Sequence, residues 1–357
     1  MNGVWGNKLG LSLFGESHGT AIGITMHGLP SGLVLDLEEV DRQMARRRPG
    51  QGKLTTSRGE TDQVEIVSGF FEGKTTGTPL TGIIRNRDTR SEDYEDVRHR
   101  VRPGHGDYPG KIRYSGHEDF RGGGHFSGRL TAPLVFAGAV ARQWLSGRGV
   151  RIGAHIQEMG GVYGGSFQKD PVSEGVLDRL GRMTWPVLDE TSWARMEEAV
   201  LEARQDKDSV GGIVECAVLH LPPGLGDPFF HSVESRLAGL LYSVPAVKAL
   251  SFGSGFAMAR MRGSEANDPY RIRAGAVVTT SNHNGGITGG ITNGMPLIFR
   301  VAVKPTPSIG LPQETIDFVT MKETQIEIRG RHDPCIVPRV VPVVEACAAL
   351  AMMDLML

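Results

Sequence analysis

Glycine and proline interrupt this chain at short intervals, and that feature limits the folds open to it. Of its 357 residues, 49 are glycine and 20 are proline, together roughly a fifth of the chain against an average of about 12%. No collagen-like or low-complexity period accompanies them, so they mark special backbone positions in loops. Polar and apolar segments alternate without a linker or a solenoid-length repeat. We therefore expect a single domain over residues 1–357.

The segments between these breaks predict an α+β fold. Helical patterns cover residues 36–48, 134–145, 193–204, 232–243 and 343–355. Asp36 and Glu39 resemble a capping pair for the first of them, and the last follows Pro342. Strand patterns cover residues 9–14, 22–26, 63–68, 80–85, 212–219, 297–304 and 325–328. Because the strands lie partly in adjacent pairs joined by short turns, we expect antiparallel pairing more than a parallel βαβ series.

The composition excludes several classes of protein. With 39% hydrophobic and 22% charged residues and a formal net charge of -1, the chain is typical of a folded protein, and non-specific nucleic-acid binding is disfavoured. The three cysteines form no CxxC motif or Cys/His array, which argues against a disulfide framework or a metal site. A signal peptide pattern and an apolar run of ~18 residues are both missing, so we expect a cytoplasmic protein without membrane contact.

Arginine is concentrated in one part of the chain. Of 30 arginines, 14 lie between Arg42 and Arg129, although the chain as a whole is balanced in charge. Several stand among Gly, Pro or Ser instead of on a salt-bridged helix face, namely Arg46, Arg47, Arg48, Arg102, Arg129 and Arg331. Their planar guanidinium groups suit bidentate contacts with phosphate and carboxylate. Brought together, they would form a pocket for a small, multiply charged acid.

Two of the eleven histidines stand out. His18 follows an apolar strand pattern, and His105 lies in a stiff Pro-Gly turn beside Arg102. A lone histidine is most often a structural group, but bound anions would favour the protonated imidazole, which could then act as a general acid. Near the C-terminus, Arg331 and Asp333 could respectively hold an anion and accept a proton. The rigid loop at residues 304–308 is either a plain strand exit or a contact that offers an ammonium group and two hydroxyls to a cofactor phosphate or ring edge.

The sequence contains incomplete matches to two nucleotide-binding motifs. Gly73, Lys74 and Thr75 resemble the end of a phosphate loop, but Ser68 stands where that motif needs glycine. A β-hairpin over this segment is the simpler interpretation, and a P-loop NTPase is a distant alternative. The glycine clusters at 122–124 and 285–290 lack the spacing of a dinucleotide fingerprint.

Ten ordered segments together resemble the chorismate synthases, over about residues 5–355. In the first half they are Gly15-Glu16-Ser17-His18-Gly19, Arg46-Arg47-Arg48-Pro49-Gly50-Gln51, Gly73-Lys74-Thr75-Thr76-Gly77-Thr78-Pro79, Arg102-Pro103-Gly104-His105 and Arg121-Gly122-Gly123-Gly124 continuing to Ser127-Gly128-Arg129. In the second half they are Asp208-Ser209-Val210-Gly211-Gly212, Pro245-Ala246-Val247-Lys248, Gly285-Gly286-Ile287 with Gly289-Gly290-Ile291, residues 304–308, and Gly330-Arg331-His332-Asp333-Pro334-Cys335.

The resemblance implies a fold, a reaction and a cofactor. The fold would be a sandwich of two antiparallel four-stranded sheets around helices, assembled as a homotetramer. The reaction would be the 1,4-trans elimination of phosphate from 5-enolpyruvylshikimate 3-phosphate, which gives chorismate in the shikimate pathway. Reduced FMN would act as a catalyst that is not consumed, with NADPH as a possible reductant. A flavin- or anion-binding relative without turnover is the main alternative.

The resemblance also assigns residues to roles. His18 would protonate the departing phosphate, His105 would serve the reduced flavin, and Asp333 would help the flavin N5 act as a base. Substrate phosphate and carboxylates would be held by Arg47, Arg48, Arg102, Ser127, Arg129 and Arg331. Flavin contacts would come from His125, Phe126, Ser127, Pro245, Ala246, Gly289, Lys304, Pro305, Thr306, Pro307, Ser308 and Arg331. Arg47 and Lys53 occupy the positions that some members assign to NADPH.

Some positions depart from the family pattern. After the glycine triplet, many members have Arg-Ser-Ser, whereas this chain has His125, Phe126 and Ser127. A flavin-facing arginine is thereby replaced by histidine, which bears on FMN affinity more than on the chemistry. Lys53 likewise replaces an arginine.

Overall fold

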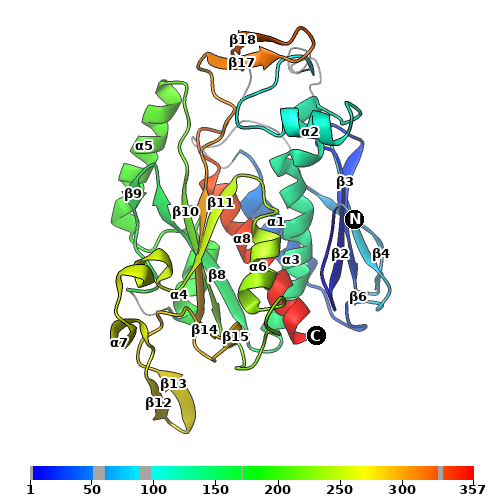
Figure 1. The fold of residues 1–357 in the computed structure, drawn as a ribbon. Coiled ribbons are helices and arrows are strands. Elements are labelled where there is room, and N and C mark those ends of the chain that lie inside the picture. The colour runs from blue at the N-terminus through cyan, green and yellow to red at the C-terminus, as the bar shows by residue number, and fades with distance from the viewer. Residues whose placement is uncertain (1–2, 51–60, 88–97, 170–171, 329–332) are drawn as a thin grey trace.

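The computed structural model describes residues 3–50, 61–87, 98–169, 172–328 and 333–357 (Figure 1). Within these ranges, two antiparallel sheets enclose a layer of helices, with one sheet on each side (Figure 1). Short hairpins and loops extend from both ends of this body. Lys53, Arg331 and His332 lie outside the described residues.

The first sheet is built from the N-terminal quarter of the chain. Its strands run in the order β1-β2-β3-β7-β4, and every neighbouring pair is antiparallel. Their bounds are β1 Val4–Trp5, β2 Gly10–Gly15, β3 Ala21–His27, β7 Leu80–Arg85 and β4 Val64–Ser68. Ile22, Ile24 and Met26 alternate along β3 and are fully buried, as expected for the face of a sheet that packs on helices.

The second sheet has the order β11-β16-β10-β8-β9, again antiparallel throughout. Its bounds are β11 Val247–Phe252, β16 Leu297–Val303, β10 Gly212–Leu219, β8 Arg151–Met159 and β9 Val162–Tyr163. Val214, Cys216 and Val218 of β10 belong to the main core beneath the helices. Ala217 and Leu219 point to the other face and form a small second core. Both faces of β10 are therefore buried.

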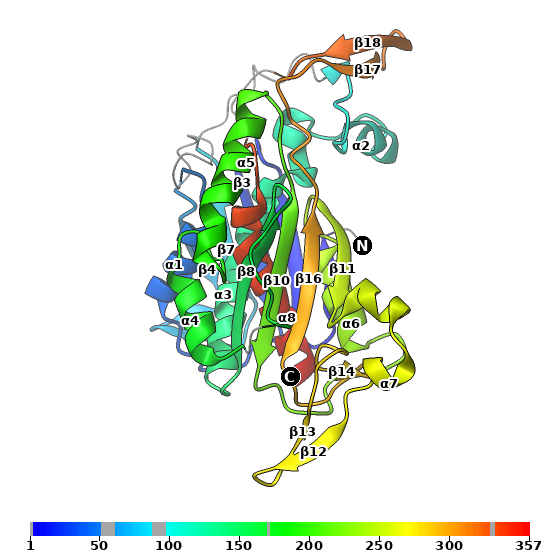
Figure 2. The ribbon, with the colours of Figure 1, turned by 90° about the vertical axis from the view of Figure 1, so that its left-hand side faces the viewer.

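The remaining described strands form two-stranded hairpins. These are β5 Phe70–Phe71 with β6 Lys74–Thr75, β12 Tyr270–Arg273 with β13 Ala276–Thr279, β14 Ile287–Thr288 with β15 Ile291–Thr292, and β17 Gln313–Asp317 with β18 Lys322–Ile326. The β12–β13 and β17–β18 hairpins project from opposite ends of the molecule (Figures 1 and 2).

The helices are α1 Leu37–Arg47, α2 Asp107–Arg113, α3 Thr131–Ser146, α4 Glu174–Arg182, α5 Trp193–Gln205, α6 Val233–Leu241, α7 Gly263–Ala266 and α8 Val337–Met356. Figure 2 shows α4 and α5 in front of the second sheet, whereas α1, α3, α6 and α8 form the central layer (Figure 1). Among the described helices, none combines the length and the apolar character that a membrane crossing needs.

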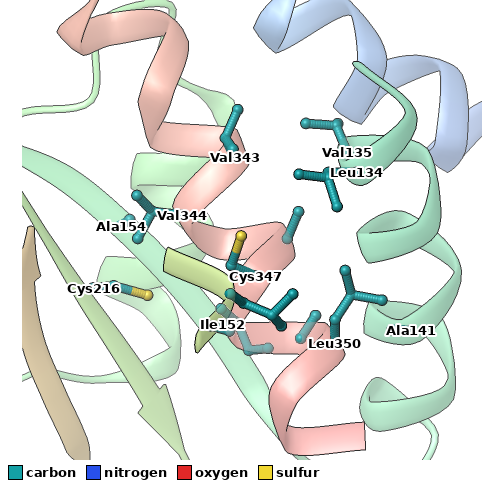
Figure 3. Close-up of a cluster of buried hydrophobic side chains, with 14 of the residues drawn as sticks. Leu134, Val135, Ala141, Ile152, Ala154, Cys216, Val343, Val344, Cys347 and Leu350 are labelled. Carbon is teal, nitrogen blue, oxygen red and sulfur yellow. The ribbon is translucent and has the colours of Figure 1, made fainter. Parts of the chain in front are cut away.

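The packing of α3 against α8 forms the centre of the core. Leu134 and Val135 of α3 and Cys347 and Leu350 of α8 lie in the same buried cluster (Figure 3). A Cβ added at Gly138 would overlap Ala346 of α8, so glycine permits the close approach of the two helices. Such an alanine would force them apart and open the core.

The structure confirms most of the expected elements and corrects others. The α+β class with antiparallel sheets and the hairpin of β4 with β7 are confirmed. Among the described residues, however, each main sheet has five strands, because the short edge strands β1 and β9 join the four longer ones. The nine-residue strand β8 and the helices α2, α4 and α7 were not predicted.

The predicted start of the last helix is wrong. Helix α8 begins at Val337 and continues through Pro342, which lies inside it. Pro338 lies in the first turn, where proline is tolerated best, but Pro342 lies in the second turn, where it removes a backbone hydrogen bond and its ring crowds the carbonyl of Pro338. Apolar contacts along both turns hold the segment, since Val337, Val340 and Val341 are all buried.

Candidate active site

One cavity brings together segments from the whole length of the chain. It measures about 750 Å³ and lies beside the C-terminal end of α1, the N-terminal ends of α2, α3 and α8, and the loops after β2 and β16. Predicted site residues that line it are His18, Arg47, Arg102, His105, His125, Phe126, Ser127, Arg129, Pro245, Ala246, Lys304, Thr306, Pro307, Ser308 and Asp333. Polar groups from distant loops therefore converge on one concave surface, as in small-molecule sites.

Three predicted site residues do not line this cavity. Arg48 and Pro305 neighbour residues that do. Gly289 joins β14 to β15, next to the end of β16 that begins at Leu297, whereas the cavity residue Lys304 follows its other end. The length of the strand separates them by about 20 Å. The remaining two, Arg331 and Lys53, lie outside the described residues.

Arg47 and Arg129 share a buried carboxylate, that of Asp62. Nη1 of Arg47 donates to Oδ2 of Asp62 at 3.0 Å, and Nη1 of Arg129 donates to Oδ1. We call these three residues the cavity ion cluster. The side chain of Asp62 is 0% exposed, and those of Arg47 and Arg129 are 4% and 11% exposed. Burial alone would raise the pKa of Asp62, but the two guanidinium groups hold that pKa below its usual value.

Positive charge exceeds negative charge around Arg47. Burial and the guanidinium of Arg339 lower the pKa of Arg47 to about 9, with Arg129 adding to the effect and Asp62 opposing it. Nη2 of Arg47 donates to the carbonyl of Gly128 at 2.8 Å, and Nε donates to the hydroxyl of Thr131 at 3.1 Å. The guanidinium plane is thereby fixed. A bound anion would relieve the unfavourable concentration of cations.

The neighbouring Arg46 belongs to a different cluster. Its guanidinium donates to both oxygens of Glu345, which also accepts from Nη1 of Arg142 at 3.0 Å and from the backbone of Ala154 at 2.9 Å. We call Arg46, Glu345 and Arg142 the core ion cluster. None of the three lines the cavity. Its sequence setting predicted that Arg46 would join the anion-binding arginines, whereas its contacts with Glu345 hold α1 against α8.

Arg102 is held by a carboxylate of its own turn. Its Nε and Nη2 donate to the two oxygens of Asp107 at 2.7 and 2.8 Å, and its backbone N–H donates to Oδ2 at 3.0 Å. Asp107 begins α2. This bidentate pair fixes a third guanidinium group in the cavity wall.

His105 has a defined tautomer. Its Nδ1 lies 3.0 Å from the carbonyl of Pro103, which can only accept, so Nδ1 carries the proton. Burial, followed by the charge of Arg102, lowers the pKa of His105 to about 4. The ring is therefore neutral near pH 7, and Nε2 accepts from the hydroxyl of Ser308 at 2.8 Å. The protonated form expected from the sequence requires an anion that is bound nearby.

His18 packs against the glycine triplet. Gly122, Gly123 and Gly124 all have positive φ angles of 60°, 81° and 52°. The backbone of Ser17 donates to the carbonyl of Gly124 at 3.1 Å, and the Ser17 hydroxyl donates to that of Gly122 at 2.9 Å. A Cβ on Gly122 would lie 2.6 Å from Nε2 of His18. The triplet therefore positions the imidazole and leaves room for it.

Asp333 is oriented by an arginine that the sequence analysis did not identify. Nη1 of Arg339, in the first turn of α8, donates to Oδ2 of Asp333 at 2.6 Å, and its Nε donates to the carbonyl of Arg47 at 3.1 Å. Asp333 and Arg339 both line the cavity. Asp62, Asp107 and Lys248 were also missed as site residues. Only Asp107 and Lys248 had a signal, since they lie in or next to segments that carry the family resemblance.

A further group of cavity residues suits a phosphorylated cofactor. Lys248 and Lys304 both line it, and burial together with the charge of Lys248 lowers the pKa of Lys304. Among the described side chains, the Thr306 hydroxyl is a buried group without a hydrogen-bond partner. A phosphate would accept hydrogen bonds from these groups. No group of three or more potential ligand side chains suited to a metal occurs in the described part of the chain.

Comparisons with known proteins agree with one another. The family model described as chorismate synthase matches residues 9–357. A protein of Korarchaeum cryptofilum named chorismate synthase is 48% identical over 353 residues, which cover 98% of this chain and 96% of that protein. One of Dehalococcoides mccartyi with the same name is 43% identical over 357 residues, which cover 100% of this chain and 97% of the relative.

A solved structure is also similar. The crystal structure of a chorismate synthase superposes with a TM-score of 0.76 at 27% sequence identity, and the match covers 98% of this chain and 92% of that one.

Proposed function

The chain belongs to the chorismate synthase family, and we propose that it performs the family's reaction in the cavity described above. The protein is a carbon–oxygen lyase of the shikimate pathway, and it eliminates phosphate from 5-enolpyruvylshikimate 3-phosphate to give chorismate. One observation carries the assignment of the site. Arg47, Arg102 and Arg129, from three separate segments, line the same cavity, and a substrate with a phosphate and two carboxylates needs such fixed cations when it is buried.

We propose that Arg47 and Arg129, the two arginines of the cavity ion cluster, receive the substrate phosphate. Arg47 and Arg129 are already fixed by hydrogen bonds, so little reorganisation accompanies binding. Ser127 lines the cavity next to them. His18, held against the glycine triplet, would donate a proton to the leaving phosphate oxygen. Arg102, fixed by Asp107, would hold a carboxylate.

His105 and Asp333 would take part in the proton transfers. Neutral His105 presents Nε2 to Ser308, so it can accept a proton at that atom. The carboxylate of Asp333 is 7% exposed and held by Arg339. It would accept or relay the proton that leaves the substrate ring.

Reduced FMN fits the chemistry of the remaining cavity wall. Lys304, Thr306 and Ser308 offer donors for a phosphate and ring edges, with His125, Pro245, Ala246 and Pro307 close by. Phe126 is 43% exposed and provides an apolar surface for a flat ring. When bound, reduced FMN would supply electron density to the substrate transiently without being consumed. NADPH as its reductant, with Arg47 and Lys53 as contacts, stays a prediction.

We also propose that the protein works as a homotetramer in the cytoplasm. Phe229 and Phe230 are 90% and 88% exposed, and Ile272 on the projecting β12–β13 hairpin is 78% exposed. Apolar side chains in such positions favour association between subunits. Assembly would also give Gly289 a route to a flavin, since it lies at the far end of β16 from the cavity of its own chain. Three buried free thiols suit a reducing compartment.

The direct test is anaerobic phosphate release from 5-enolpyruvylshikimate 3-phosphate with reduced FMN. We expect release at the rate of chorismate formation and none with oxidised FMN. The control is the same protein with substrate alone. Flavin and substrate binding without phosphate release by the folded protein would instead support the non-catalytic alternative.

A further inference from the structure

The carboxylate of Asp62 is a buried charge that the proposed mechanism does not use. It is surrounded by protein, yet both guanidinium groups bonded to it line the cavity. A buried carboxylate between two cations is costly to form unless each partner is well placed. Asp62 therefore lies behind the cavity wall, in contact with two groups that line it.

The geometry explains how one carboxylate can orient two arginines. Its two oxygens are divided between them, with Oδ2 accepting from Arg47 and Oδ1 from Arg129. Each guanidinium has a further fixed partner, Thr131 for Nε of Arg47 and Asn86 for Nε of Arg129, both at 3.1 Å. Asp62 is a partner that the two groups share, so it links the placement of one guanidinium to that of the other.

The same carboxylate also lowers the positive charge that a phosphate meets. Two guanidinium groups share one negative charge, and Arg339 adds a third cation close enough to act on both Arg47 and Asp62. Charges that are buried are screened less than exposed charges. An anion held by Arg47 and Arg129 would lie close to the Asp62 carboxylate and be repelled by it.

We propose that Asp62 is a positioning residue that sets Arg47 and Arg129 for the substrate phosphate and, through its charge, limits how tightly the released phosphate is held. This rests on the proposed function, which places the phosphate at these arginines. Orientation favours the elimination, while the opposing charge favours departure of the product. Asp62 therefore contributes to both halves of the turnover.

The test separates charge from shape. Asp62→Asn keeps the shape of the side chain and removes the charge, whereas Asp62→Glu keeps the charge and moves it. Inorganic phosphate is titrated calorimetrically into each FMN-loaded protein at constant ionic strength. We expect Asp62→Asn to bind phosphate on the order of 10-fold more tightly than the unmodified protein, with lower turnover and stronger product inhibition. Asp62→Glu should lower turnover without tighter phosphate binding.

Glu345→Gln is the matched control, because Glu345 also bridges two arginines but lies away from the cavity. Its phosphate affinity should equal that of the unmodified protein. Equal phosphate affinity in Asp62→Asn would overturn the proposal. If Asp62→Asn is only marginally folded, phosphate should raise its unfolding temperature more than that of the unmodified protein, and an equal shift would contradict the proposal. Failure of the unmodified protein to release phosphate from substrate would instead refute the proposed site.

Discussion

Arg46 and Arg47 are adjacent in the sequence and on the same helix, but they belong to two different ion clusters. The core ion cluster is closed: Arg46 uses both oxygens of Glu345, and this carboxylate raises the pKa of Arg46 more than burial lowers it. The cavity ion cluster is open: burial and Arg339 lower the pKa of Arg47 to about 9 despite Asp62. Both clusters hold two arginines and one carboxylate, so their surroundings make the difference. The core ion cluster does not line the cavity and stabilises the fold, whereas the cavity ion cluster has the further cation Arg339 beside it and is prepared for an anion.

The largest expected effect concerns His18, which lies in the cavity. His18→Ala removes the proposed proton donor, so turnover should fall by roughly 10²–10⁴, while FMN affinity and the free energy of unfolding change little. Anaerobic phosphate release, flavin titration and urea unfolding would measure the three quantities. A large loss of FMN affinity with unaffected turnover would assign His18 to flavin binding and not to proton donation.

Glu345→Ala should give the opposite result. It leaves Arg46 and Arg142 buried without their carboxylate, and we expect a loss of about 3–5 kcal/mol in the free energy of unfolding. Phosphate release per folded molecule should remain close to that of the unmodified protein, because Glu345 does not line the cavity. Urea unfolding combined with the anaerobic assay checks this. A catalytic defect without loss of stability would show that the core ion cluster serves the reaction and not the fold.

The pH dependence of stability should reveal His105. Its pKa is depressed to about 4 in the folded protein, against about 6.5 when unfolded. Between these values the unfolded chain binds the extra proton, so the free energy of unfolding falls as the pH drops from about 6.5 to about 4, by up to about 3 kcal/mol.

His105→Asn should lack this component. The stability difference between the unmodified protein and the variant should therefore shrink towards pH 4, as measured by urea unfolding across the range. A difference that does not vary with pH would mean that His105 titrates normally.

The smallest expected effect concerns the N-terminal cap of α1, the helix that carries one arginine of each cluster. Asp36 caps α1 by accepting from the backbone of Glu38 and Glu39, and α1 carries both Arg46 and Arg47. Asp36→Ala should cost about 1 kcal/mol of stability and slightly lower turnover, because both clusters depend on the same helix. Asp36→Ser, which keeps a cap, is the control. Normal stability in Asp36→Ala would show that packing alone holds α1.

Sequence patterns predicted the elements whose periodicity agreed with their burial. Helix α3 was recognised from a long segment after Pro133 that is apolar almost all round, and α1 from its capping pair and from the Pro49-Gly50 stop. Strand β8 was missed since His155 and Gln157 interrupt its apolar character. Both are buried, and His155 lies 2.9 Å from Glu215 of β10. Such cross-strand pairing is not visible in a local pattern.

The site was predicted in part for a similar reason. Arg47, Arg102 and Arg129 were recognised by their residue type and setting, and their convergence is observed. The roles of Asp62 and Arg339 depend on contacts between segments far apart in the chain, which residue types alone do not indicate. The same limit explains why Arg46 was grouped with Arg47, since the direction of each side chain is decided by tertiary packing.

The most direct test of the account replaces each of the two neighbouring arginines by lysine. Lysine keeps the charge but loses the fork that holds several partners. The quantity to measure is kcat/KM for anaerobic phosphate release per folded molecule. Arg47→Lys should lose roughly 10–100-fold, because at least one charge-assisted hydrogen bond disappears from the cavity wall, whereas Arg46→Lys should retain nearly full activity. Equal losses in both variants, or a larger loss in Arg46→Lys, would contradict the assignment of Arg47 to the active site and of Arg46 to the core.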